Sequence, residues 1–189
     1  PIENGELIIE NGIILEVSPQ ISQRKTEVTL NLSDHLLMPG FVNAHSHLGL
    51  TALAKKLSSS KNFASWIRDL IPLNSALSDA ERMDGIQKGA REMKYSGVTG
   101  LADYVADPAL LDSIGNLGFR SVLFLEVIGF QEKRAKDLAD KVETILKSHN
   151  SKWNLGIAPH APYSVSEKLF RQLDKLSKEY GCLLSTHLA

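Results

Sequence analysis

The stretch MPGFVNAHSH, residues 38–47, places two histidines at the end of a short apolar run. Apolar residues in such a run are typical of a strand that is buried on both faces. Residues two apart in an extended strand point to the same side, so His45 and His47 can direct two imidazoles at one point. Imidazole suits zinc or ferrous iron, and a catalytic site needs about three protein ligands. The stretch therefore predicts a strand that ends at a metal site.

Four more apolar runs follow, at intervals that leave room for helices. They are GVTGLADYV (97–105), FRSVLFLEVIG (119–129), WNLGIAPHA (153–161) and CLLSTHLA (182–189). The segments between the runs carry apolar residues at helical spacing. Ser78 and Glu81 form a capping-box pattern before one helix, and Gly181 is a stop signal after another. We therefore predict five parallel strands that alternate with helices.

This alternation fits either a doubly wound open sheet or a (β/α)8 barrel. Four histidines fall at the C-terminal ends of predicted strands, where both architectures build their active sites. These are His45, His47, His160 and His187. No glycine-rich phosphate loop follows the first strand, which weakens a nucleotide-binding interpretation. The pattern alone leaves the two architectures open.

The opening segment has a different pattern. Residues 3–19 alternate apolar and polar side chains around Asn11-Gly12, a strong hairpin signal. We therefore expect a small β segment over residues 1–36, followed by a domain of alternating strands and helices over residues 37–189.

Charge and composition narrow the class of ligand. The chain has 189 residues, with 21 Lys and Arg against 22 Asp and Glu, and its net charge is −1. It therefore lacks the excess of positive charge that is typical of proteins that bind nucleic acid or an anionic membrane. Its single cysteine excludes a disulfide within the chain and a cysteine-based zinc site. No apolar run approaches the roughly 20 residues that span a bilayer. We expect a small-molecule substrate and, by default, a cytoplasmic protein.

Three motifs resemble those of a known family. MPGFVNAHSH resembles the first-strand signature of the amidohydrolase superfamily. APHAPYSVS (158–166) and STHLA (185–189) resemble the fourth- and fifth-strand motifs of its chlorohydrolase and nucleoside-deaminase branch. The resemblance covers essentially the whole chain. It implies the N-terminal part of a (β/α)8 TIM-type barrel, about five β/α units, preceded by half of a small β-sandwich.

The same resemblance assigns the histidines. His45, His47 and His187 match metal ligands, and His160 matches a histidine that contacts the substrate. Residues 153–162 contain no lysine that could be carbamylated to bridge two metals, so we expect one divalent ion, zinc as the first choice and iron as the second. The structural alternatives are a buried core role for His187 and a turn-bracing role for His160 between two prolines. His35 and His149 are assigned no part in the chemistry.

The activity that the resemblance implies is hydrolytic deamination of an aminated purine-like heterocycle, through attack by metal-bound hydroxide. The family's general acid/base glutamate lies three residues beyond the fifth-strand histidine, which here falls past Ala189. We therefore expect a truncated chain that is inactive alone and needs the missing half of its barrel; a homo-oligomer stays open. The alternatives are chlorohydrolase or other amidohydrolase activity, or a non-catalytic metal-binding or interaction fragment.

One substrate clue lies in residues 62–73, which resemble the loop that carries an aromatic residue over the substrate in this branch. Trp66 is the candidate, although it can equally anchor the neighbouring helix. Adenosine-type deaminases of the branch place a carboxylate just before this tryptophan, whereas this chain has Ser65.

A second clue is FLEVIG (124–129), which together with FASWI (63–67) resembles the aminofutalosine deaminases. Glu126 is then a candidate substrate contact, and its structural alternative is pairing with Arg120 or a neighbouring basic residue within the barrel. Asp103, at the end of the second predicted barrel strand, is expected to be a structural hydrogen-bond acceptor.

Overall fold

The computed structural model describes residues 2–19, 24–57, 62–149 and 151–188, which divide into two compact units, residues 1–39 and 40–189. The first unit holds an antiparallel hairpin of β1 (Glu6–Glu10) and β2 (Ile13–Ser18). Asn11 and Gly12 connect the two strands with φ values of 51° and 77°. Positive φ at both positions suits a tight two-residue turn, so the predicted hairpin is confirmed.

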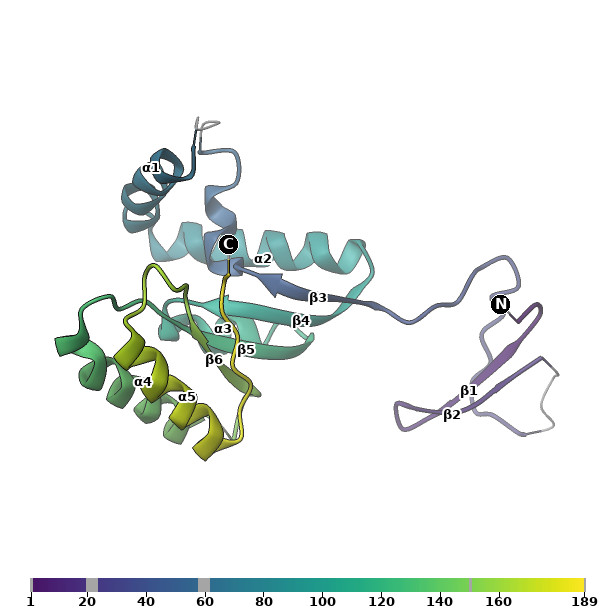
Figure 1. The fold of residues 1–189 in the computed structure, drawn as a ribbon. Helices are drawn as coiled ribbons and strands as arrows, with labels where there is room; N and C mark the ends of the chain where they lie inside the picture. The colour runs from purple at the N-terminus through teal and green to yellow at the C-terminus, as the bar shows by residue number, and fades with distance from the viewer. Residues whose placement is uncertain (1, 20–23, 58–61, 150, 189) are drawn as a thin grey trace. The chain divides into compact units, whose positions relative to one another are not determined.

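The second unit is built on a parallel sheet of four strands (Figure 1). These are β3 (Phe41–Ser46), β4 (Val98–Val105), β5 (Arg120–Val127) and β6 (Leu155–Pro159), hydrogen-bonded in the order β3-β4-β5-β6. Each strand therefore lies beside the next one in the sequence. A doubly wound sheet reverses its strand order at a switch point, whereas a barrel advances in one direction. The sheet order thus selects the barrel from the two architectures that the pattern left open.

Helices and short 3-10 turns connect the strands. They are η1 (Leu48–Leu53), α1 (Phe63–Ser75), α2 (Asp79–Tyr95), η2 (Pro108–Leu110), α3 (Leu111–Gly115), η3 (Glu132–Arg134), α4 (Ala135–His149) and α5 (Glu167–Tyr180). The capping box of Ser78 and Glu81 is present at the start of α2, and Gly181 ends α5 with φ 62°. Among the described residues, no helix is both long and apolar enough to cross a membrane.

Alternate residues of the strands face two different environments. One set packs with α2, α3, α4 and α5 into the main core; its strand members are Leu101, Val105, Leu123, Leu125, Val127, Leu155 and Ile157. The other set forms a small cluster of Tyr104, Phe124 and Ala158, with Ala102 and Val122 beside it. Because the helices contribute only to the first set, the second set lies on the face that becomes the inside of a barrel.

The fifth predicted strand is less regular than expected. Residues 182–188 run beside β6 and form a single parallel bridge, Leu184 to Ile157. The amide of Ser185 donates to Ile157 O, but the next donor in a regular ladder would be Pro159, which has no N–H. The pairing resumes at the amide of His187, which donates to His160 O over 2.9 Å. The proline therefore explains why this segment follows the sheet without forming a continuous ladder.

Two glycines of α2 let η1 approach the helix closely. A Cβ at Gly85 would lie 2.5 Å from the backbone N and 2.7 Å from the Cα of Ala52. A Cβ at Gly89 would instead meet side-chain atoms of Leu48 and Thr51, the nearest at 2.9 Å. Because η1 directly follows His47, this contact fixes the turn that carries one of the candidate metal ligands.

We predict that Gly85→Ala lowers the free energy of unfolding of the full-length protein by about 1–3 kcal/mol, because backbone atoms must move. Alanine gains roughly 1 kcal/mol of helix propensity, which offsets only part of this cost. Gly89→Ala is the matched control, since side chains can rotate away from the new methyl. Urea denaturation measures both variants, and a Gly89→Ala variant as unstable as Gly85→Ala would contradict the explanation.

Candidate metal centre

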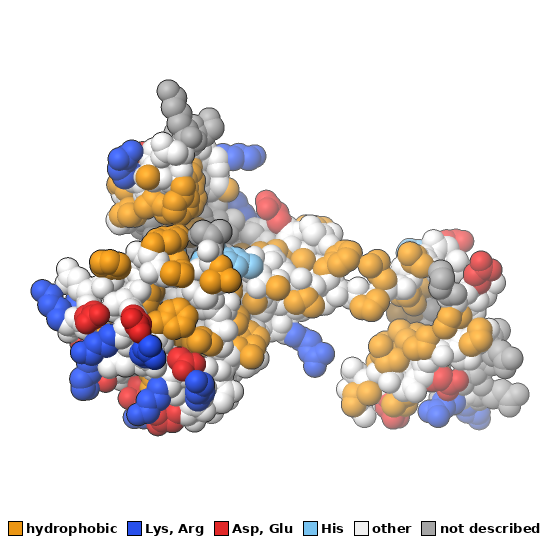
Figure 2. All heavy atoms as spheres, in the orientation of Figure 1, with side chains coloured by type: hydrophobic (Ala, Val, Ile, Leu, Met, Phe, Trp, Pro, Cys, Tyr) orange, Lys and Arg blue, Asp and Glu red, His pale blue; other side chains and the backbone are white. Residues whose placement is uncertain are grey.

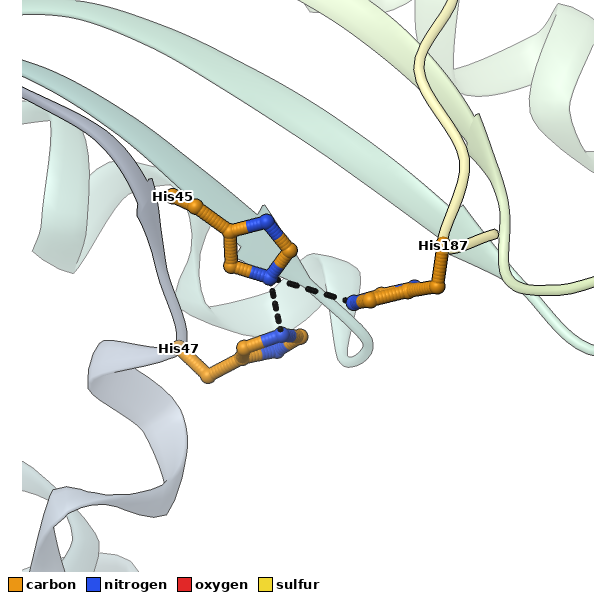
Figure 3. A group of neighbouring side chains, drawn as sticks. All are labelled: His45, His47 and His187. Atoms are coloured by element: carbon orange, nitrogen blue, oxygen red, sulfur yellow. Dashed lines mark hydrogen bonds between the residues drawn. The ribbon is translucent and has the colours of Figure 1, made fainter. Parts of the chain in front are cut away.

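Three imidazoles from the two ends of the chain's barrel segment meet at one point (Figure 3). His45 Nε2 lies 3.2 Å from His47 Nε2 and 3.1 Å from His187 Nε2. The candidate ligand atoms of these three residues all lie within 4.8 Å of one another. A tetrahedral zinc ion with Zn–N bonds near 2.0–2.1 Å has ligand atoms about 3.3 Å apart. The spacing of the nitrogens is therefore compatible with one shared ion.

The strand β3 and the turn after it position the first two imidazoles. His45 lies in β3, where its amide donates to Asn43 Oδ1 over 3.2 Å. Its ring stacks on Tyr104, with centroids 4.3 Å apart and planes at 20°. His47 is the residue before η1, and its carbonyl accepts the amide of Leu50. The predicted geometry of the H-x-H pair is thus found, with the second histidine just past the strand.

His187 is held by the backbone of His160. Both its amide and its ring Nδ1 contact His160 O, over 2.9 Å and 2.7 Å. Nδ1 must carry the hydrogen to donate to a carbonyl, so the lone pair of the neutral ring is on Nε2, the atom beside His45. A backbone partner of this kind is what fixes the tautomer of a metal-ligating histidine.

His160 itself is oriented by Ser164. Its Nδ1 lies 2.7 Å from Ser164 Oγ, and that hydroxyl donates to Ala161 O over 3.1 Å. The hydroxyl hydrogen is used there, so Nδ1 of His160 donates to the hydroxyl oxygen and Nε2 keeps its lone pair. His160 therefore braces the turn, as its structural alternative proposed, and still presents a ring nitrogen to the site.

The surroundings favour the neutral form of His45, His47 and His160. Burial lowers the pKa of His47 to about 4, helped by repulsion from His45, His187 and His160. Burial, together with the charge of His187, also lowers the pKa values of His45 and His160. Neutral imidazole is the form that binds metals, so these pKa values favour ligation near neutral pH.

Asp103 links β4 to the segment that carries His47. Its side chain is fully buried, and Oδ1 accepts hydrogen bonds from Ser46 Oγ (2.6 Å) and from the amide of Leu48 (2.8 Å). Ser46 and Leu48 flank His47, so the carboxylate holds both neighbours of a candidate ligand. This is the structural acceptor role that the sequence predicted. Burial raises the pKa of Asp103 to about 6, although both hydrogen bonds lower it.

Glu126 lies on the inner face at the end of β5, where Phe124 and Ala158 are its neighbours on that face. Pairing with Arg120 is not found among the described residues, because the two lie at opposite ends of the strand, about 20 Å apart. The ligand atoms of Glu126, His160 and His187 instead lie within 4.8 Å of one another. Burial raises the pKa of Glu126 to about 7, the charge of His187 lowers it, and that of Asp103 raises it.

Trp66 lies on α1 beside the imidazoles. It lines an open, mainly apolar cavity of about 310 Å³ together with His47, Leu50, Leu53 and Leu70. Figure 2 shows histidine side chains reaching the surface beside apolar side chains, below the segment that carries α1. The tryptophan thus packs on its neighbours and also faces a space that opens next to a candidate ligand.

Sequence reasoning missed the aromatic residues around the site. Tyr104 supports the His45 ring, and Phe63 lies beside both Trp66 and Tyr163, with ring centroids 6.0 Å and 6.4 Å away. Alternate side chains of the predicted strand 97–105 share one face, and this pattern could have predicted that Tyr104 faces the barrel interior. The contact between Phe63 and Tyr163 joins segments 100 residues apart, so no local pattern predicts it.

The chain is similar in sequence to known proteins. The sequence profile described as "Amidohydrolase family" matches residues 36–189. A 5'-deoxyadenosine deaminase of Methanobrevibacter smithii is 29% identical over 98% of this chain, which spans 44% of that protein. The chain thus covers about half the length of the curated relatives that it matches.

Two solved structures show the same fold. An aminofutalosine deaminase of Helicobacter pylori, in complex with methylthio-coformycin, has a TM-score of 0.68 and 24% identity over 79% of this chain and 37% of its own. An adenosine deaminase of Xanthomonas campestris with bound zinc has a TM-score of 0.72 and 24% identity over 97% of this chain and 44% of its own.

We predict that Asp103→Asn changes how stability depends on pH. Folded Asp103 has a pKa of about 6 against the ordinary 3.8, so between these values the folded state binds more protons than the unfolded state. Its contribution to stability is therefore present at low pH and is lost as pH rises through 6. The difference in unfolding free energy, wild type minus variant, should fall by roughly 2 kcal/mol between pH 4 and 7. Denaturation at both pH values measures it, and a constant difference would contradict the role of burial.

Proposed function

The chain belongs to the amidohydrolase family, and on this premise we propose that the whole protein hydrolytically deaminates an aminated purine-like heterocycle. The observation that carries the proposal is the convergence of three imidazoles, with Nε2 of His45 within 3.2 Å of Nε2 of His47 and within 3.1 Å of Nε2 of His187. A relative over 98% of the chain is named as a 5'-deoxyadenosine deaminase, which supports a purine-like substrate. The structural likeness to an aminofutalosine deaminase agrees with the resemblance in FASWI and FLEVIG.

The proposal gives His45, His47 and His187 the role of holding one divalent ion, zinc before iron. The donor set fits such an ion, because Nε2 of His187 carries a lone pair and points at the other two rings (Figure 3). No lysine in residues 153–162 is present to bridge a second metal. A bound divalent ion would supply Lewis-acid activation of water, the chemistry that hydrolysis of the exocyclic C–N bond of an aminated ring needs.

The other residues of the site would bind and orient the heterocycle. Nε2 of His160 offers an acceptor that is fixed in direction by Ser164. Trp66 and the leucines of the adjoining cavity offer an apolar wall next to His47. Tyr104 holds the His45 ring in place by stacking, so it would act as a positioning residue. The substrate would thus lie between the imidazoles and the apolar wall.

The proposal gives proton transfer to a residue that lies outside residues 1–189. The family pattern places its glutamate three residues beyond His187, which is past Ala189. We therefore propose that residues 1–189 contribute metal ligands and substrate contacts, while the proton-transferring carboxylate comes from the remainder of the barrel. On this proposal the segment alone is inactive.

We predict that the full-length protein contains about one divalent ion per chain and releases ammonia from 5'-deoxyadenosine, adenosine or aminofutalosine. His45→Ala, His47→Ala and His187→Ala should each lose most of the metal and slow the reaction by about 10³-fold, because each removes a ligand. His35→Ala is the control, since this exposed histidine lies in the first unit. Elemental analysis and an ammonia assay give the two readouts.

Chloride release from a chlorinated triazine is measured in the same assay series to distinguish the chlorohydrolase alternative. Metal-loaded protein that dechlorinates but releases no ammonia would contradict the deaminase assignment. Variants that keep full metal content would contradict the ligand assignment.

A further inference from the structure

Tyr104 carries a hydroxyl on the inner face of the sheet, where its neighbours are mainly apolar. The residue is 6% exposed and packs with Phe124 and Ala158. It lies directly opposite Phe124 in the register of β4 and β5, with ring centroids 5.1 Å apart and planes at 19°. Towards β3, the same ring stacks on His45. A phenylalanine would make all of these ring contacts, so packing alone does not account for the hydroxyl.

The hydroxyl is hydrogen-bonded to a residue on a distant segment. Its oxygen lies 2.5 Å from Oγ of Ser185. Three inter-strand spacings, about 14 Å in a flat sheet, separate β4 from the segment 182–188. The bond therefore crosses the concave side of the curled sheet. It joins the strand beside His45 to the segment that carries His187, and neither of the bonded residues is a candidate metal ligand.

The segment that contains Ser185 has an incomplete ladder of backbone bonds. Among the described residues it forms one parallel bridge to β6, and Pro159 interrupts the pairing between the amides of Ser185 and His187. Residues two apart in an extended segment point to the same side, so Ser185 shares a face with His187. The bond to Tyr104 thus fixes the segment on the face from which His187 reaches the other imidazoles.

We propose that Tyr104 and Ser185 are a positioning pair that sets the separation of His45 and His187, and with it the affinity of the site for its divalent ion. The inference rests on the proposed function, because it takes these imidazoles as metal ligands. The Tyr104 ring supports His45, and its hydroxyl holds the segment of His187, whose Nε2 lies 3.1 Å from Nε2 of His45. A site that is already held in its binding geometry loses less conformational freedom when the ion binds.

The test measures the dissociation constant of Zn²⁺ from the full-length protein by competition with a chromophoric chelator. Tyr104→Phe removes the hydroxyl but keeps the ring and its stacking, and Ser185→Ala removes the partner. Each should raise the Kd for Zn²⁺ by about tenfold, as expected for the loss of a group that orients metal ligands. Tyr180→Phe and Ser148→Ala are the matched controls and should leave the Kd unchanged, because their hydroxyls are bonded on the outer helices α5 and α4.

Two further variants test whether the effect belongs to this one bond. The double variant Tyr104→Phe/Ser185→Ala should have a Kd no more than about threefold above that of either single variant, because both changes remove the same interaction. Ser185→Thr keeps a hydroxyl at this half-buried position and should retain the Kd of wild type. If Tyr104→Phe does not fold, the comparison of Ser185→Ala with Ser185→Thr makes the same test.

The outcomes separate this inference from the proposed function. A lower free energy of unfolding in the metal-free variants, with an unchanged Kd for Zn²⁺, would overturn the positioning role, because the bond would then stabilise the fold alone. Losses of affinity that add fully in the double variant would also overturn it. Wild type that binds Zn²⁺ but releases no ammonia from aminated purines would contradict the deaminase activity, while the expected changes in Kd would still support the positioning pair. Wild type without affinity for Zn²⁺ would contradict both.

Discussion

The structure depends on the curvature that brings the two edges of a parallel sheet together. His45 lies on β3 and His187 lies beyond β6, so four inter-strand spacings, about 19 Å in a flat sheet, separate their backbones. Their Nε2 atoms are nevertheless 3.1 Å apart. Two imidazole side chains cannot bridge the flat distance, so the sheet must curl, as barrel strands do. Figure 3 shows the result, with the rings converging from opposite edges.

Apolar residues and the residues of the site occupy different parts of the inner face of the curved sheet. Tyr104, Phe124 and Ala158 fill the middle of that face, while Glu126, His160 and the three clustered imidazoles lie at the C-terminal ends of the strands. The backbone contacts of His187 and the hydroxyl of Ser164 turn the lone pairs of two rings inward. The ring nitrogens that carry these lone pairs are groups that a divalent cation can satisfy.

Much of this arrangement could be predicted from the sequence. The spacing of His45 and His47 and the capping signals around α2 and α5 are local patterns, and each is found where it was expected. The irregular fifth strand could not be predicted from hydrophobicity alone, because it results from the missing N–H of Pro159 in the neighbouring strand. Which face of the sheet Glu126 lies on depends on the register of the strands. The contact of Phe63 with Tyr163 depends on packing between distant segments. Neither can be read from a single sequence.

The central claim is that one divalent ion binds where the three imidazoles converge. Anomalous diffraction at the metal absorption edge, on crystals of the metal-loaded full-length protein, tests it most directly. The account predicts one strong peak about 2.0–2.2 Å from Nε2 of each of His45, His47 and His187. A peak bound by other residues, or no peak at these rings in protein that contains metal, would contradict it.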